Sequence, residues 1–242
     1  MDEQKDGCGT RAWLERGRRK RKALIFYSHY ISSSAERVRI AFALKKLEYS
    51  YVSVRETGWD AYRDVNPQGL VPALQVGDGL ITQTNAILNY LEEQFPEPAL
   101  LPVDPFLRAQ ARAFAQQIAC EMHPVDVHRI RRFLQTQLGI DEEGCRLWSA
   151  HWFAEGFDSL ERTLEMRADA YAYCYGDAPG WADLHLVPHV RKAVTRFDVD
   201  VARYPLILRI YERCCVLPEF EAAAPAAQPD YPGELIDPET ED

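Results

Sequence analysis

Three short motifs between residues 23 and 95 have the residue types and order needed to bind a small peptide-like ligand that carries a thiol and a carboxylate. The first group, Ser32-Ser33-Ser34, directly precedes a predicted helix. A hydrogen bond from a serine hydroxyl to a thiolate is worth roughly 1.5–3 kcal/mol, and the helix N-terminus adds about 0.3–1 kcal/mol. Together they would lower a thiol pKa of about 8.5 by roughly one to three units, which makes thiolate abundant at neutral pH. The alternative is that the serines only cap the helix.

The second and third groups offer partners for the rest of such a ligand. Val71-Pro72 opens a predicted strand, and a cis bond there would turn the N–H and C=O of Val71 toward the backbone of a bound peptide. Gln83 and Thr84 open a predicted helix, whose free N–H groups suit a carboxylate. Ordinary alternatives exist for both, because Pro is common where a strand begins and Gln83-Thr84 can be a simple N-cap pair.

A predicted α/β unit at residues 23–97 positions these groups. Strands are expected at residues 23–27 and 49–54, on either side of the helix that follows the serines, and this order favours a parallel pair with a right-handed crossover. A hairpin over residues 72–82 and a helix that ends before Pro96 follow. Residues 57–65 are expected to form a short helix or an irregular loop.

After a proline-rich linker at residues 98–104, the hydrophobic pattern is helical throughout residues 105–220. We expect helices over residues 108–138 and around residues 148–164, 184–194 and 207–216. The predicted fold class is therefore α/β plus all-α.

In the helical part, the segment with His123 and Pro124 interrupts the first helix and then supplies His128 and Arg129. Arg196, at the end of the third helix, is a second candidate arginine for contact with a substrate. An arginine near a pocket is a natural partner for a carboxylate. The alternatives are a structural histidine and a solvated Arg196.

The net charge of −9 is distributed unevenly along the chain. Residues 1–22 hold eight Lys/Arg against four Asp/Glu and predict a disordered basic arm, whereas residues 221–242 form an acidic, Pro-rich tail that we expect to be irregular. The part between them is only mildly acidic, so we expect no binding to nucleic acid. No apolar run approaches the roughly 18–20 residues of a membrane span and no secretory signal is evident, so we expect no membrane association and a cytoplasmic location.

The cysteines exclude some classes of site. None of the six cysteines forms a C-x-x-C pair or has a histidine at metal-ligand spacing, so neither a metal site nor a disulfide framework is expected. None lies between residues 9 and 119. Thiol chemistry in the α/β unit must therefore use a sulfur atom supplied by a ligand.

Eight segments of the chain, in the same order, resemble the zeta class of glutathione transferases, which includes maleylacetoacetate and maleylpyruvate isomerases. They are YSHYISSSAERVRIAFALK, NPQGLVPAL, ITQTNAILNYLEEQFPEPALLP, CEMHPVDVHRI, WFAEGFDSLE, YGDAPGWADLHLVPHV, RFDVD with YP following, and AAPAAQPD. The resemblance extends from Ala23 to Asp230. It implies a thioredoxin-like, glutathione-binding domain followed by an all-helical glutathione-transferase domain, usually in a homodimer.

The resemblance also implies a role for each candidate residue. Ser32, Ser33 and Ser34 match the motif that activates the glutathione thiol. Val71, before cis-Pro72, matches the residue that pairs with the glutathione backbone, and Gln83 with Thr84 matches the pair that binds the γ-glutamyl carboxylate. His123 and Arg129 match positions that reach glutathione or substrate, and Arg196 matches an arginine that faces the acid end of the substrate.

The chain departs from the family pattern at several points. Ile31 and Ser34 stand where an arginine and a cysteine are common, so one anchor for a substrate carboxylate is missing. The segment between Val54 and Asn66 is shorter than usual, and Gly180 replaces the Ser or Thr that caps the central helix opposite Asp183. With Ile31 in place of arginine, a substrate with one carboxylate or a less polar one fits better than a compact diacid.

The function implied is a glutathione-dependent cis–trans isomerase of a conjugated unsaturated acid or polyene, which works by thiolate addition, bond rotation and elimination. Glutathione is regenerated and so acts as a coenzyme. Two alternatives are a glutathione transferase that conjugates or dehalogenates small electrophiles, and a non-catalytic ligand-binding protein of the same fold. The sequence does not decide which of the three serines acts on the thiol, because a shift of one residue in the helix start exchanges their roles.

Overall fold

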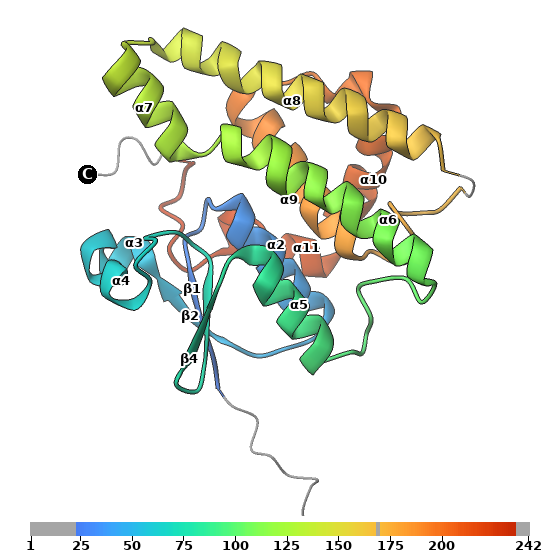
Figure 1. The fold of residues 1–242 in the computed structure, drawn as a ribbon, viewed down its shortest axis with the longest axis horizontal. Helices are drawn as coiled ribbons and strands as arrows, with labels where there is room; N and C mark the ends of the chain where they lie inside the picture. Colours follow the sequence, from blue (N-terminus) through green and yellow to red (C-terminus); the bar gives the residue numbers. More distant parts are fainter. Residues whose placement is uncertain (1–22, 168–169, 236–242) are drawn as a thin grey trace, which may run out of the picture.

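The computed structural model describes residues 23–167 and 170–235, which form an α/β unit beneath a larger group of helices (Figure 1). The predicted basic arm at residues 1–22 and the end of the acidic tail from residue 236 lie outside the described residues. The predicted fold class is confirmed, because a four-stranded sheet with its helices is followed by an all-helical part. None of the described helices is both long and apolar enough to cross a bilayer.

The sheet has the strand order β2-β1-β3-β4. Its strands are β1 (Leu24–Ser28), β2 (Ser50–Ser53), β3 (Ala73–Val76) and β4 (Gly79–Thr82). β1 pairs in parallel with β2 and antiparallel with β3, and β3 and β4 form the predicted hairpin. Burial alternates along β1, which places Phe26 in the main core and Tyr27 on the opposite face.

Four helices belong to the α/β unit: α2 (Ser33–Leu44), α3 (Val54–Thr57), α4 (Trp59–Val65) and α5 (Thr84–Gln94). α2 and α5 pack against each other on one face of the sheet. The segment expected to be a short helix or a loop forms α3 and α4, separated by Gly58 at φ 90°. Tyr62 of α4 covers part of the other face, with its ring 5.6 Å from that of Tyr27.

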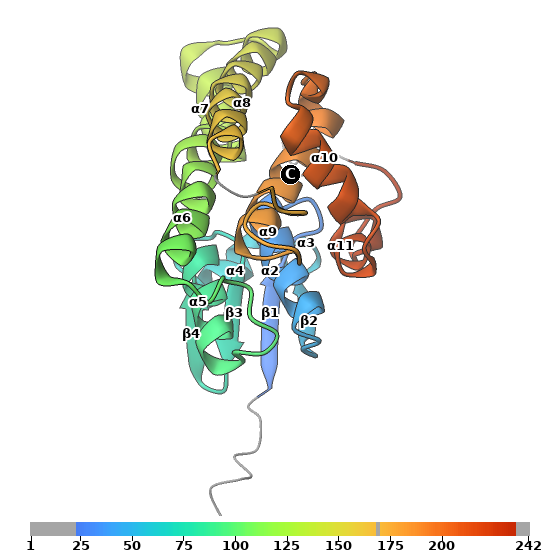
Figure 2. The same cartoon turned by 90° about the vertical axis from the view of Figure 1, so that its right-hand side faces the viewer.

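The remaining helices lie above and beside this unit (Figure 2). They are α6 (Pro105–Gln116), the π-helical turn η2 (Gln117–Met122), the 3-10 turn η3 (His123–Val125), α7 (His128–Leu138), α8 (Glu142–Glu165), α9 (Trp181–Phe197), the 3-10 turn η4 (Val201–Arg203), α10 (Pro205–Cys215), α11 (Pro218–Ala223) and the 3-10 turn η5 (Pro225–Ala227). The long helix expected over residues 108–138, with an interruption at Pro124, is present as several shorter helices. It is divided into α6, η2, η3 and α7, because Pro124 has no N–H to continue the hydrogen-bond ladder.

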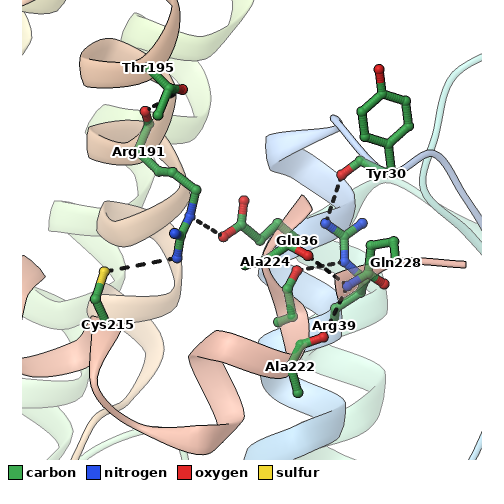
Figure 3. Close-up of polar contacts among 10 residues, drawn as sticks. Tyr30, Glu36, Arg39, Arg191, Thr195, Cys215, Ala222, Ala224 and Gln228 are labelled. Carbon is green, nitrogen blue, oxygen red and sulfur yellow. Dashed lines mark hydrogen bonds and ion pairs between the residues drawn. The ribbon is translucent and has the colours of Figure 1, made fainter. Parts of the chain in front are cut away.

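Helix α9 joins the two parts of the molecule by packing directly on α2. Arg191 Nε of α9 donates to Glu36 Oε1 of α2 at 3.0 Å, and Glu36 is almost fully buried (Figure 3). A buried carboxylate needs such a partner, because its desolvation is otherwise costly. The ion pair therefore fixes the helix that begins at the serines against the all-helical part.

Gly180, noted in the sequence as an unusual cap, begins α9 at a point of close approach. Its N–H donates to Asp183 Oδ2 at 2.9 Å, and a Cβ atom at this position would lie 2.6 Å from the carbonyl oxygen of Leu100. The same oxygen accepts the N–H of Trp181 at 2.7 Å. Glycine therefore allows the start of α9 to pack on the linker that follows the α/β unit.

The described part of the C-terminal tail lies against the rest of the protein. Beyond α11 and η5 it contains no further helix or strand as far as residue 235, but Gln228 and Asp230 are buried. This segment returns from the helical part to the α/β unit.

Candidate active site

The three serines lie where β1 turns into α2. Ser32 is the N-cap of α2, and its Oγ accepts a hydrogen bond from the N–H of Ala35 at 3.2 Å. Ser33 and Ser34 are the first two residues of the helix. Ser32 therefore caps the helix through its hydroxyl oxygen, as the capping alternative requires. The same hydroxyl can still donate its proton to an external group.

Ser34 is linked to the helical part through His123. Its Oγ lies 2.9 Å from His123 Nε2, although 89 positions separate the two residues in the chain. Burial, followed by the charges of Arg37, Lys192 and Arg129, lowers the pKa of His123 well below its ordinary value. His123 is therefore neutral near pH 7 and acts as a hydrogen-bond partner for Ser34 rather than as a cation.

The start of α5 lies beside the start of α2. Thr84 Oγ1 donates to the carbonyl oxygen of Ser34 at 3.3 Å. Gln83, directly before the helix, has φ 70°, and its side-chain amide donates to Gln68 Oε1 at 2.9 Å. A positive φ in a residue other than glycine is uncommon and often occurs where the backbone is shaped for a ligand. Two helix N-termini, both favourable to negative charge, therefore meet at one place.

The Val71–Pro72 peptide bond is cis. Val71 precedes β3 and is half-buried against the small apolar cluster of Val54, Tyr62 and Ala73. Among the described residues, its backbone makes no hydrogen bond to another backbone group outside helices and strands. The cis bond is the one considered from the sequence, and the pairing of the Val71 N–H and C=O with a ligand stays a prediction.

The two candidate arginines differ in their relation to this group. Arg129, in the first turn of α7, is exposed and lies close enough to His123 to lower its pKa. Arg196 is in the last turn of α9, with its guanidinium 5.6 Å from the ring centroid of Phe197. Burial, with a smaller contribution from the charge of Arg196, lowers the pKa of Lys192 to about 8, and the Lys192 ammonium lies 2.6 Å from Asp126 Oδ2. The structure therefore places Arg129 near the Ser34–His123 pair and Arg196 farther along α9.

The sequence reasoning missed a row of residues on α9. His185, His189, Lys192 and Arg196 recur at intervals of four, three and four residues, which places them on one helix face. His185 Nε2 lies 2.8 Å from Asn85 Oδ1 of α5, and the His189 ring lies 6.0 Å from that of His123. The helical spacing was the available signal, but nothing in it specified which elements this face contacts. Gln68 was missed because it is distant in sequence from Gln83.

Ile31 occupies the position where the family resemblance leads us to expect an arginine. It is half-buried, directly before Ser32, and its N–H points to His29 Nδ1 at 3.4 Å. The position therefore offers an apolar surface beside the serines instead of a cation. The described residues contain no cluster of three or more His, Cys, Asp or Glu able to hold a metal ion. The site offers hydroxyls, helix N-termini and arginines, which suit an anionic ligand and a thiolate.

Comparisons with known proteins agree with this geometry. Residues 26–99 match the family model described as glutathione S-transferase, N-terminal domain. The chain is 42% identical to a maleylpyruvate isomerase of Ralstonia sp., over 84% of this chain and 98% of that protein.

Solved structures give the same result. The chain resembles a holo structure described as maleyl pyruvate isomerase, a bacterial glutathione S-transferase in zeta class, with a TM-score of 0.82 and 41% identity over 85% of this chain and 99% of that one. It also resembles maleylacetoacetate isomerase from Anaeromyxobacter dehalogenans with glutathione bound in the active site, with a TM-score of 0.78 and 37% identity over 87% and 98% of the two chains.

Proposed function

The chain belongs to the zeta class of glutathione S-transferases, and we propose that it is a glutathione-dependent cis–trans isomerase of a conjugated unsaturated acid or polyene. The observation that carries this proposal is the junction of two helix N-termini, where Thr84 of α5 is bonded to Ser34 of α2. This junction offers one location for a thiolate and another for a carboxylate, on two helices whose first turns are joined by a hydrogen bond.

The residues present fit glutathione along its length. The N–H groups of the first turn of α5, with Gln83 and Thr84, would hold the γ-glutamyl carboxylate. The unpaired backbone of Val71 would pair with the cysteine residue of the tripeptide. The thiol would then lie at the start of α2, beside the serines.

Ser32 is the serine best placed to stabilise the thiolate. Its oxygen already accepts the N–H of Ala35, which leaves the hydroxyl proton to be donated outward and polarises it for that purpose. Ser34 is instead engaged with His123. Ser33 follows Ser32 and supports the same anion through its position in the first turn of α2.

When bound, glutathione would supply a thiolate able to add to the cis double bond; the bond would then be single and free to rotate, and loss of the same thiolate would restore it in the trans form. The protein residues bind and orient the substrate and stabilise negative charge. We assign to Arg129 the charge that develops on the conjugated acid, because it lies near the Ser34–His123 pair. Arg196 is assigned to the carboxylate of the substrate, while Arg129 stabilises the enolate-like charge that develops during addition.

The apolar surface at Ile31 supports a substrate that is less acidic at this end. A compact diacid would place its second carboxylate without a cationic partner here, and a carboxylate in a partly desolvated site requires one. We therefore propose a substrate with one carboxylate, or a less polar polyene. The quaternary structure is proposed to be a homodimer and the location cytoplasmic, both on the basis of the family resemblance.

The experiment is a screen of cis-configured unsaturated acids and polyenes, followed by ultraviolet absorbance with and without glutathione. Isomerisation that requires glutathione without consuming it is the expected result. Glutathione methylated on sulfur is the matched control, because it can make the same carboxylate and backbone contacts. It should give no reaction, since its sulfur cannot form a thiolate. A product that retains glutathione in mass spectrometry would favour conjugation, and binding without any turnover would favour a non-catalytic ligand-binding protein.

A further inference from the structure

The C-terminal segment at residues 224–231, called here the C-terminal strap, crosses from the helical part to the α/β unit and ends beside the loop that carries the serines. The side chain of Asp230 is only 3% exposed and accepts three hydrogen bonds. The donors are the N–H of Tyr30 at 3.1 Å, the Tyr51 hydroxyl at 2.7 Å and the Ser53 hydroxyl at 3.1 Å. One donor in the turn after β1 and two in β2 thus bind a single carboxylate, which belongs to a segment about 200 residues farther along the chain.

The opposite side of the same loop is held by Arg39 of α2. Its guanidinium donates to the carbonyl oxygen of Tyr30 at 3.0 Å (Figure 3). It also donates to the carbonyl oxygen of His29 at 3.3 Å, and its Nε donates to that of Ala223 at 2.9 Å. Asp230 lies close enough for its charge to favour the buried guanidinium. Both backbone groups of Tyr30 are therefore bonded to charged side chains, one of which belongs to the strap.

The strap has enough structure of its own to present Asp230 in one position. Gln228 Nε2 donates to the carbonyl oxygens of Ala222 and Ala224, at 2.9 and 2.8 Å. The ring of Tyr231, the residue after Asp230, lies 5.7 Å from that of Tyr30 in an edge-on arrangement. These hydrogen bonds within the C-terminal segment already limit its conformations. Its contact with the loop therefore costs little further conformational entropy.

The bonded loop leads directly to the proposed thiol site. Tyr30 is two residues before Ser32, and the N–H of Ser32 donates to the carbonyl oxygen of His29 at 3.1 Å. That oxygen also receives a hydrogen bond from Arg39. A displacement of Tyr30 would therefore move Ser32 at the N-cap of α2, and displacements of about 1 Å at a reacting group can cost about a hundredfold in rate.

We propose that Asp230 is a positioning residue for the reaction: through the N–H of Tyr30 it fixes the loop between β1 and α2, and thereby the direction in which Ser32 donates to the glutathione thiolate. The inference rests on the proposed function for the identity of the ligand. It assigns a part in the active site to the C-terminal strap, which contains none of the residues proposed to contact glutathione or substrate.

The test compares Asp230→Ala with Tyr51→Phe in the full-length protein. Tyr51→Phe removes one hydrogen bond from the same carboxylate, the one to Oδ1, and leaves Oδ2 bonded to Tyr30. Three quantities are measured: the melting temperature, the amide hydrogen exchange of residues 29–33, and the pKa of the bound glutathione thiol, followed by the ultraviolet absorbance of the thiolate.

Both variants are expected to lower the melting temperature, since each loses buried hydrogen bonds. Only Asp230→Ala is expected to accelerate exchange at residues 29–33 by about tenfold or more, to raise the pKa of the bound thiol by about one unit, and to lower kcat more than it changes KM for glutathione. If Asp230→Ala does not fold, Asp230→Asn keeps the size and one acceptor oxygen, and is expected to show the same changes in smaller measure.

An Asp230 variant that melts earlier but keeps the thiol pKa and the kcat of the native protein would overturn the inference, because the strap would then be a stability element alone. The proposed function fails by a separate observation. A native protein that binds glutathione and isomerises nothing would contradict the isomerase assignment, while the exchange and thiol measurements on Asp230 would still decide the role of the strap.

Discussion

Replacing Ser32 tests the proposed origin of the thiolate, because the side chain performs two tasks that can be separated. Its oxygen caps α2 by accepting the N–H of Ala35, and its hydroxyl proton is assigned to the glutathione thiolate. Ser32→Ala removes both, whereas Ser32→Gly removes the hydroxyl but retains most of the capping preference, at a cost of only a few tenths of a kcal/mol. The two variants should therefore differ in stability and agree in chemistry.

The expected magnitudes follow from these two contacts. Loss of the cap in Ser32→Ala should lower the free energy of unfolding by about 0.5–2 kcal/mol. Loss of a hydrogen bond to a charged sulfur, worth roughly 1.5–3 kcal/mol, should raise the pKa of the bound thiol by about one to two units. At a pH below the pKa of the native bound thiol, this lowers the thiolate fraction by roughly 10–100-fold, and kcat should fall in proportion.

The assay combines urea unfolding with a titration of the ultraviolet absorbance of thiolate in the glutathione complex. Ser32→Thr, which keeps both the acceptor oxygen and the hydroxyl proton, is the matched control and should retain both properties. The reasoning is refuted if Ser32→Gly binds glutathione with the thiol pKa of the native protein. In that case the helix N-terminus, or a neighbouring serine, would account for the activation.

Four further outcomes are expected. Ile31→Arg should raise kcat/KM for an unsaturated diacid by about tenfold, since a charge-assisted hydrogen bond to the second carboxylate becomes available; equal turnover of the diacid by the variant and the native protein would count against the proposed substrate class. Burial lowers the pKa of His185 to about 3. Below about pH 6.5 the unfolded chain therefore binds more protons than the folded one, and the free energy of unfolding must fall as the pH falls. His185→Gln should reduce this loss of unfolding free energy between pH 6.5 and 5 by up to about 2 kcal/mol, measured by urea midpoints. Lys192→Met leaves the buried Asp126 carboxylate without its ammonium partner at 2.6 Å and should cost about 3–5 kcal/mol of unfolding free energy, whereas Arg162→Met in the exposed pair with Glu165 should cost less than about 1 kcal/mol. Gly180→Ala should lower stability by about 1–3 kcal/mol in thermal unfolding, because its Cβ would meet the Leu100 carbonyl oxygen at 2.6 Å.

The predictions from sequence succeeded where the determining interactions are short in range. The strands, the hairpin and the helix after the serines depend on the alternation of neighbouring residues and on local turns, and the structure contains all of them. Ser32 was recognised as a possible cap because capping involves only the next three residues.

The sequence was less informative where contacts join distant segments. The break in the helix at Pro124 was foreseeable, but the π-helical turn η2 before it depends on packing against α8 and α9. The pairing of Ser34 with His123, and of Tyr30 with Asp230, spans 89 and 200 positions, and no local pattern encodes such a partner. The row of His185, His189 and Lys192 was visible in its spacing, yet its meaning depends on the elements that α9 contacts.

The hydrogen bond from Thr84 to the carbonyl oxygen of Ser34 has a consequence for how this enzyme can diversify. It ties the proposed recognition site for one end of the coenzyme to the proposed activation site for the other end, so a substitution that shifts either site should disturb both. Variation that alters the chemistry without losing the coenzyme is therefore confined to positions outside that tie. Ile31, α7 and the end of α9 are such positions, and new substrates should be acquired there first.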